Sequence, residues 1–128
     1  MILVDTSILI AYLRSHNTKL LARFQELDAV VAGTIRAEIL HGSRNVDDTR
    51  RLLEFLAAFP TLGTPETLWD EVGLLLCSLR KKSIQVLFND VVIGLLAVTY
   101  NVELWTADHD YEAIQSVETR LVPYSDAG

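Results

Sequence analysis

The chain begins with the stretch MILVDTSILI, residues 1–10, in which one carboxylate, Asp5, interrupts a largely apolar run. The residues Ile2–Val4 predict a buried β-strand, because a short unbroken apolar run suits a strand that is covered on both faces. An ionised carboxylate is costly to bury without a partner. Asp5 therefore either caps a helix that follows it or marks a pocket at the end of the strand, and the stretch itself leaves both interpretations open.

Beyond this stretch, short apolar runs alternate with longer segments of helical periodicity. Further strands are expected at Ala29–Ala32, at 102–106 and, as a short last strand, at 121–122. Helices are expected at 19–27, 34–42, 47–59, 64–79, 89–100 and 111–116, with Thr34 and Asn89 as caps and Trp69 in the core. Strands that alternate with helices predict an α/β fold whose mainly parallel sheet is covered on both faces.

The composition is that of one globular domain spanning residues 1–128. Hydrophobic residues make up 50% of the chain, which argues against disorder. The longest apolar run, at 91–98, is far too short to cross a membrane, and Asp5 comes too early for a signal peptide, so the expected location is the cytoplasm. Cys77 is the only cysteine, which excludes an intrachain disulfide.

Five acidic residues stand near strand ends or helix starts: Asp5, Glu38, Asp90, Asp108 and Asp110. In a parallel sheet such places converge at one edge, where ligands bind. Each acid alone has a structural explanation, as a helix cap, a dipole partner or a solvated side chain, but together they predict a shared pocket. Carboxylates that share a pocket need protons or cations, and oxygen ligands favour Mg²⁺ or Mn²⁺. One or two such ions can activate a water and orient a phosphodiester.

The net charge of −6 argues against a protein that holds nucleic acid on a broad basic surface. The objection weakens if some carboxylates bind cations, because substrate phosphates then meet metal ions and not bare acids. Arginines outside the acidic set, Arg14 and Arg44 among them, are candidates for contacts with the flanking backbone of a phosphodiester substrate, and Arg44 also for a carboxylate of a partner.

Four segments together resemble PIN-domain proteins, and within them the VapC-type toxins of prokaryotic toxin–antitoxin pairs. The segments are ILVDTSILIAYL at 2–13, TIRAEILHGSR at 34–44, FNDVVIGLLAVTYNVELWTADHDYEAI at 88–114 and LVPY at 121–124. Each motif alone is modest, whereas their order and spacing are specific. The resemblance covers essentially the whole chain.

The resemblance implies a three-layer α/β/α sandwich with divalent-metal-dependent endoribonuclease activity. Position by position, it assigns the first, second, third and fourth catalytic, metal-binding acids to Asp5, Glu38, Asp90 and Asp108. It matches Asp110 to a further acid just after the fourth, so that the choice between these two stays open.

Three other positions have counterparts in the family. Thr6 and Thr106 match small polar residues that can orient the carboxylates. Gly94 stands where the family often has alanine. It either leaves open space beside the pocket or allows close packing of its helix against the sheet.

The resemblance also implies the cofactor and the partners: one or two Mg²⁺ or Mn²⁺ ions, an RNA substrate, a homodimer, and a VapB-type antitoxin that wraps the protein and blocks the pocket. The apolar stripe around Leu20, Leu21 and Phe24 can serve the core or such a partner, and the core is the simpler expectation.

Three rival functions remain to be weighed. A receiver-like phosphoacceptor domain would need an acidic pair near the first strand and a late lysine, but Asp5 has no acidic neighbour and the last lysine is Lys82. A non-catalytic scaffold that acts with a DNA-binding partner, and a metal-dependent deoxyribonuclease, share the same acids. Only the family resemblance favours RNA as the substrate.

Overall fold

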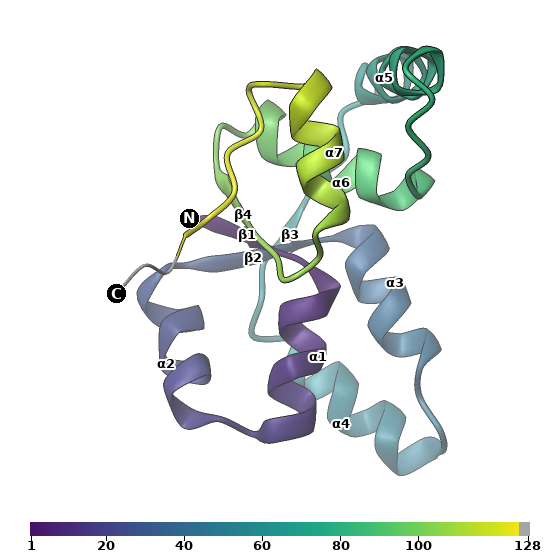
Figure 1. Cartoon of the computed structure of the whole chain (residues 1–128). Coiled ribbons are helices and arrows are strands. Elements are labelled where there is room, and N and C mark those ends of the chain that lie inside the picture. The colour runs from purple at the N-terminus through teal and green to yellow at the C-terminus, as the bar shows by residue number, and fades with distance from the viewer. Residues whose placement is uncertain (126–128) are drawn as a thin grey trace.

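The structure of the chain is a computed structural model that describes residues 1–125. A four-stranded parallel sheet runs through its centre (Figure 1). Its strands are β1 (Ile2–Val4), β2 (Ala29–Ala32), β3 (Thr61–Leu62) and β4 (Glu103–Trp105), in the order β3-β2-β1-β4. Every neighbouring pair is parallel. All residues of β1 and β2 are buried, as expected for apolar strands that are covered on both faces.

Helices cover both faces of this sheet. Figure 1 shows α1 (Thr6–Ser15), α2 (Thr18–Glu26), α3 (Gly33–His41) and α4 (Val46–Leu56) on one side, and α5 (Leu68–Lys81), α6 (Phe88–Thr99) and α7 (Asp110–Val117) on the other. The prediction of an α/β/α sandwich with a parallel sheet is therefore confirmed. Among residues 1–125, no helix combines the length and the apolar character that crossing a membrane would require.

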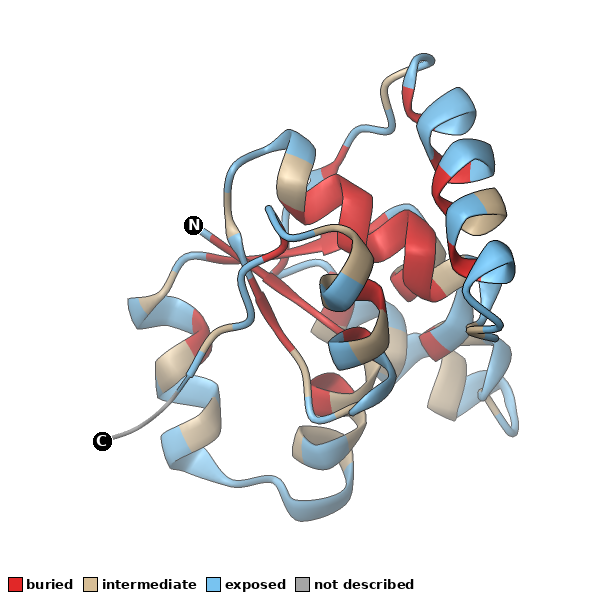
Figure 2. Ribbon diagram, turned by 45° about the horizontal axis from the view of Figure 1, so that its top comes forward, coloured by how far each residue is buried: buried red, intermediate tan, exposed pale blue. Residues whose placement is uncertain are grey.

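Helix α6 forms much of the core on its side of the sheet. Every residue from Asp90 to Ala97 is buried, and the helix packs against α5, α7 and β4 (Figure 2). A helix that is apolar on all sides is buried on all sides. The long apolar run of the sequence is thus a central helix, whose first turn carries Asp90 into the interior.

Two strand expectations differ from the structure. The edge strand β3 was not predicted, because two residues after Pro60 carry no periodicity. The expected strand at 121–122 is reduced to an isolated bridge between Leu104 and Pro123. Proline cannot donate to a ladder, which limits further pairing there.

The start of α5 and the place of Trp69 were predicted wrongly. The helix begins at Leu68, after a turn in which the Leu68 amide donates to the Pro65 carbonyl. Its buried stripe, spaced by four, three and four residues, leaves Trp69 about one-quarter of a turn away and 47% exposed. The buried residues of this stripe are Leu68, Val72, Leu75 and Leu79.

The strand order determines where a site can form. From β1 the chain moves outward to β2 and β3 with helices on one face, and it then returns to β4, on the other side of β1, with helices on the opposite face. The order therefore reverses between β1 and β4, and a crevice opens at their carboxyl ends in folds of this type. Asp5 directly follows β1, and Asp108 follows β4 in the next loop.

Candidate active site

The register of β1 and β4 places Asp5 beside the end of β4. Val4 lies opposite Trp105, and the Asp5 amide donates to the Trp105 carbonyl at 2.9 Å. Thr106, the residue that directly follows β4, donates its hydroxyl to Asp5 Oδ2 at 2.8 Å. The predicted contact of Thr106 with an acidic side chain is thus present, between residues 101 positions apart in the sequence.

The side chain of Asp5 does not cap α1, although Asp5 occupies the N-cap position. The first turn is held instead by its backbone carbonyl, which accepts from the amides of Ile8 and Leu9. The carboxylate is 5% exposed and accepts from the hydroxyls of Ser7 and Thr106. The interpretation of Asp5 as a side-chain cap is therefore wrong.

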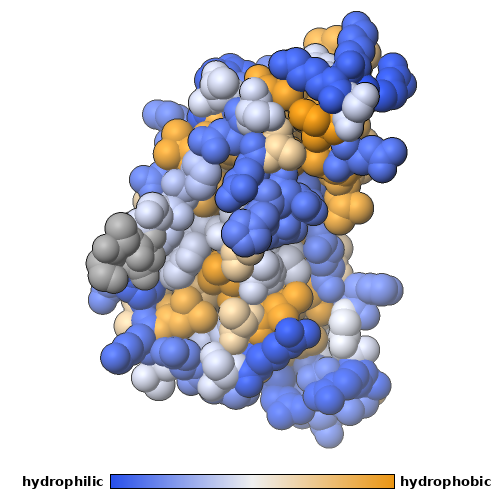
Figure 3. Space-filling model, in the orientation of Figure 1, coloured by the Kyte–Doolittle hydropathy of each residue, from blue (hydrophilic) through white to orange (hydrophobic). Residues whose placement is uncertain are grey.

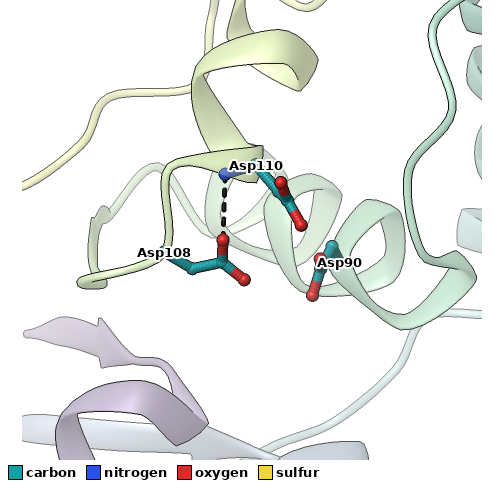
Figure 4. A group of neighbouring side chains, drawn as sticks. All are labelled: Asp90, Asp108 and Asp110. Carbon is teal, nitrogen blue, oxygen red and sulfur yellow. Dashed lines mark hydrogen bonds between the residues drawn. The ribbon is translucent and has the colours of Figure 1, made fainter.

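Asp90, Asp108 and Asp110 form a compact acidic cluster (Figure 4). One carboxylate oxygen from each lies within 4.8 Å of the others. Asp90 comes from the first turn of α6, and the other two come from the loop after β4 and the start of α7. The loop is braced by its own bonds, because the Asp110 amide donates to Asp108 Oδ1 and the Asp108 amide to Thr106 Oγ1, both at 2.9 Å.

The carboxyl group of Asp90 is buried beside other acids. Its burial, and then the charges of Asp108 and Asp5, raise the pKa of its carboxyl to about 6. Its Oδ2 atom is buried and has no hydrogen-bond partner among the described residues. A carboxylate that has one buried oxygen without a donor and is grouped with two more carboxylates fits a hard divalent cation well.

The hydroxyl of Tyr111 joins Asp5 to this cluster. It lies 3.3 Å from Asp5 Oδ1 and 3.3 Å from Asp90 Oδ1. Burial, and then the two neighbouring carboxylates, raise the pKa of Tyr111 well above its usual value, so the hydroxyl keeps its proton. With one proton and two acceptors, it can donate to only one carboxylate at a time.

Glu38, on α3, is exposed. Thr6 donates to its Oε2 at 3.1 Å, and the Asn89 amide group donates to its Oε1 at 3.2 Å. These two donors adjoin Asp5 and Asp90 in the sequence, so Glu38 is held next to both. It is not part of the three-residue cluster.

Several local predictions at the site were wrong. Asn89 does not cap α6, which begins at Phe88, and its amide group binds Glu38 instead. Thr34 does not cap α3, where Ala32 holds the cap position. At Gly94, a Cβ atom would lie 3.5 Å from Leu121 and 3.7 Å from Ile114. The expectation of open space at Gly94 is therefore wrong, and the neighbours belong to α7 and the C-terminal segment and not to the sheet.

Sequence reasoning missed two residues of the site. Ser7 donates to Asp5 at 2.9 Å and accepts from the Ala107 amide at 3.0 Å, whereas only its neighbour Thr6 was singled out. Tyr111 was counted only as a helix residue and an aromatic. The position of Ser7, two residues after Asp5, was an available signal, but nothing local indicates where the Tyr111 hydroxyl points.

Arg14 and Arg44 lie away from the acidic cluster, in a groove between α1, α3 and α4. The groove has a volume of about 600 Å³. Glu38 also lines it, and the hydrogen bonds of Glu38 to Thr6 and Asn89 connect the groove to the segments that carry Asp5 and Asp90. Its charged lining residues are Arg14, Glu38, Arg44, Asp48 and Arg51.

Comparison with known proteins places the fold and the family of the chain. A curated relative, Ribonuclease VapC4 of Mycobacterium tuberculosis (strain ATCC 25618 / H37Rv), is 32% identical over 94 residues, which are 72% of each chain. Two similar solved structures are VapBC2 from Rickettsia felis bound to a promoter DNA fragment and VapBC-1 from nontypeable Haemophilus influenzae.

The first of these has a TM-score of 0.82 at 19% identity and covers 97% of this chain and 98% of its own. The second has a TM-score of 0.81 at 21% identity and covers 98% of each. At such identities the likeness shows the fold. The model of the PIN domain family matches residues 2–117, and the chain therefore belongs to the PIN-domain family.

Proposed function

We propose that the protein is a metal-dependent endoribonuclease that acts as the toxin of a VapBC-type pair. The observation that carries the proposal is the unpartnered, buried Oδ2 of Asp90 beside the carboxylates of Asp108 and Asp110. Such an arrangement is unfavourable for the folded protein unless protons or a cation occupy it. The similarity to a protein named as a ribonuclease supports RNA as the substrate.

In this proposal Asp5, Asp90 and Asp108 hold Mg²⁺ or Mn²⁺, with Asp110 as a further ligand and Glu38 at the rim. When bound, one or two such ions supply the charge that activates water and stabilises the phosphorus centre in the transition state. Hydroxyls of the chain hold the ligands in place: Ser7 and Thr106 orient Asp5, while Thr6 orients Glu38. An RNA substrate makes the cytoplasm the expected location.

The central experiment measures cleavage of single-stranded RNA by wild type, Asp5→Asn and Asp90→Asn, with Mg²⁺ or Mn²⁺ and with chelator. We expect chelator or either substitution to lower the rate on the order of 100-fold or more, because charge stabilisation is lost. Asp47→Asn is the matched control, since this acid is exposed on α4 and pairs with Arg50. Cleavage by Asp90→Asn at the wild-type rate would refute the assignment.

Mn²⁺ binding provides a readout that does not depend on cleavage. Asp90 must lose its proton to bind a cation, and its raised pKa of about 6 means that protons compete below that pH. Mn²⁺ affinity should therefore fall as the pH is lowered through 6, and Asp90→Asn should be weak at every pH. Binding without cleavage would indicate a scaffold, and faster cleavage of single-stranded DNA would indicate a deoxyribonuclease.

A VapB-type antitoxin and a homodimer complete the proposal. Similar solved structures are VapBC complexes, which supports an antitoxin partner. Co-expression with the product of a neighbouring reading frame tests this, because a true antitoxin should co-purify and suppress RNA cleavage. A neighbouring product that neither binds nor inhibits would exclude that product as the antitoxin.

A further inference from the structure

We propose that the groove between α1, α3 and α4 binds the sugar–phosphate backbone of single-stranded RNA on one side of the cleavage site. The inference rests on the proposed function and names where its substrate lies. The first support is continuity. Glu38 lines the groove, and its carboxylate is held by Thr6 and Asn89, the neighbours of Asp5 and Asp90. A strand that leaves the acidic pocket past Glu38 enters this groove.

The second support is charge. Three arginines, Arg14, Arg44 and Arg51, line the groove of a protein whose net charge is −6. The guanidinium group matches phosphate oxygens with paired donors and always carries its charge. One of the two acids in the lining, Glu38, belongs to the rim of the acidic pocket. The rest of the groove is therefore cationic, in contrast to the molecule as a whole.

The third support is the way in which two arginines are held. Asp48 lies between them, 3.4 Å from Arg44 Nε and 3.9 Å from Arg51. Its side chain is 15% exposed, whereas those of Arg44 and Arg51 are 79% and 72% exposed. One carboxylate thus restrains two guanidinium groups without neutralising both, and it leaves most of their donors accessible to a ligand.

The remaining lining indicates backbone recognition. It consists largely of aliphatic side chains, Ile10, Leu13, Ile39 and Leu52, and the imidazole of His16 is the one aromatic ring among the lining residues. Sequence-specific recognition of single strands relies on stacking with such aromatic rings and on contacts to base edges. Contacts to phosphates hold the strand in register and carry no sequence information. We therefore expect the groove to bind RNA strands of different sequence with similar affinity.

Two adjacent arginines of α4 allow a matched test. Arg51 lines the groove, whereas Arg50 is not among its lining residues and pairs with Asp47. Fluorescence anisotropy with labelled single-stranded RNA would measure binding and its salt dependence in Asp90→Asn protein, in which cleavage is suppressed. We expect Arg51→Ala to weaken binding about tenfold, as for loss of a charged hydrogen bond. The slope of log K against log salt should fall by about 0.7, the value for one phosphate contact.

Arg50→Ala should leave both quantities close to those of the parent protein, and Arg51→Lys should retain the salt slope. Arg14→Ala, on a different helix, should reproduce the effect of Arg51→Ala. In the otherwise wild-type protein, Arg51→Ala should raise KM for RNA while kcat and Mn²⁺ affinity stay constant. Equal thermal melting of the variants would separate these effects from a loss of folding.

The outcomes distinguish this inference from the proposed function. If Arg51→Ala and Arg50→Ala bind RNA equally with the same salt slope, the groove assignment is wrong, whatever the acidic cluster does. If Arg51→Ala weakens only the binding of a protein partner, the groove is a partner site and the assignment is also wrong. If wild type cleaves no RNA but Arg51→Ala still weakens RNA binding, the groove assignment is supported and the nuclease proposal is wrong.

Discussion

At the scale of single residues, the Tyr111 hydroxyl has the most unusual surroundings in the site. The residue is 1% exposed and its hydroxyl touches one oxygen of Asp5 and one of Asp90. Its ring holds the hydroxyl in place, because the ring is buried in the core together with Ile114 of the same helix, α7. Tyr111 is thus suited to position two proposed ligands of the metal without being a ligand itself.

Tyr111→Phe tests this positioning role, since it removes the hydroxyl and keeps the ring. We expect the dissociation constant for Mn²⁺ to rise about tenfold, as for other groups that orient metal ligands. The kcat for RNA should fall while KM changes little, because the altered groups lie away from the groove that binds the strand. Isothermal titration and steady-state kinetics measure the two effects.

Tyr12→Phe is the control for this experiment. Tyr12 stacks on Phe55, and its ring lies among the aromatic side chains between α1 and α4, away from the acids. The loss of the Tyr12 hydroxyl in this variant should leave the Mn²⁺ affinity unchanged. If Tyr111→Phe binds Mn²⁺ with wild-type affinity, the positioning role is wrong and Tyr111 serves only in packing.

At the scale of elements, the contact between α6 and α7 determines whether the acids meet. Helix α6 carries Asp90, while α7 begins with Asp110 and Tyr111. Gly94 lies at their contact, one turn after Asp90, where Ile114 of α7 and Leu121 approach. A small side chain at this position lets α7 lie close enough for its first turn to reach the pocket.

Two substitutions of Gly94 should therefore have opposite effects. In Gly94→Ala the new methyl group makes ordinary contacts at 3.5 and 3.7 Å, and alanine favours the helix, so the free energy of unfolding should rise by about 1 kcal/mol. Gly94→Leu should lower it by about 1–3 kcal/mol through overpacking. By displacing α7, it should also weaken Mn²⁺ binding.

Urea unfolding and Mn²⁺ titration of the two Gly94 variants measure these effects. The Gly94→Ala protein should bind Mn²⁺ as wild type does, because its methyl group faces α7 and the C-terminal segment and not the acids. Loss of Mn²⁺ binding in Gly94→Ala would show that this position borders the pocket after all.

At the scale of the whole molecule, apolar side chains remain uncovered on α5 and at the start of α6. Trp69, Leu74, Leu87 and Phe88 are 47%, 70%, 66% and 54% exposed. Figure 2 shows α5 with buried residues on its inner side and exposed residues on its outer side, and Figure 3 shows hydrophobic side chains over this part of the surface. Large exposed apolar residues gathered in one region are typical of an association surface.

We expect these residues to form the interface of the proposed homodimer. Light scattering should give about twice the chain mass of 14.3 kDa. Leu74→Lys should shift the protein toward the monomer, because it places a charge in a buried apolar contact. Lys19→Ala, at an exposed position on α2, should leave the mass unchanged. A wild-type protein that is monomeric at micromolar concentration would rule the dimer out.

The success of sequence reasoning varied with the distance over which an interaction acts. The buried strands Ile2–Val4 and Ala29–Ala32 were predicted correctly, because unbroken apolar runs report burial on both faces. Helix starts were predicted less well, since Asn89 and Thr34 are good caps by type but lie inside their helices. The side chain of Asn89 binds Glu38 from 51 residues away, and that contact outweighs its local preference.

Asp5 and its surroundings illustrate which features of the site are specified by the amino-acid sequence and which are set only by the tertiary structure. The sequence already specified a buried strand, a carboxylate at its end, four further acids at comparable places and an alternation that implies a parallel sheet. Folding set the reversal of strand order between β1 and β4 and the register that pairs Val4 with Trp105. From these follow the bond from Thr106 to Asp5 and the position of Tyr111 between Asp5 and Asp90. The physical reason is the sequence separation over which the two kinds of interaction act. Periodicity and burial arise from residues a few positions apart, whereas hydrogen bonds between residues about a hundred positions apart depend on how the packed layers meet.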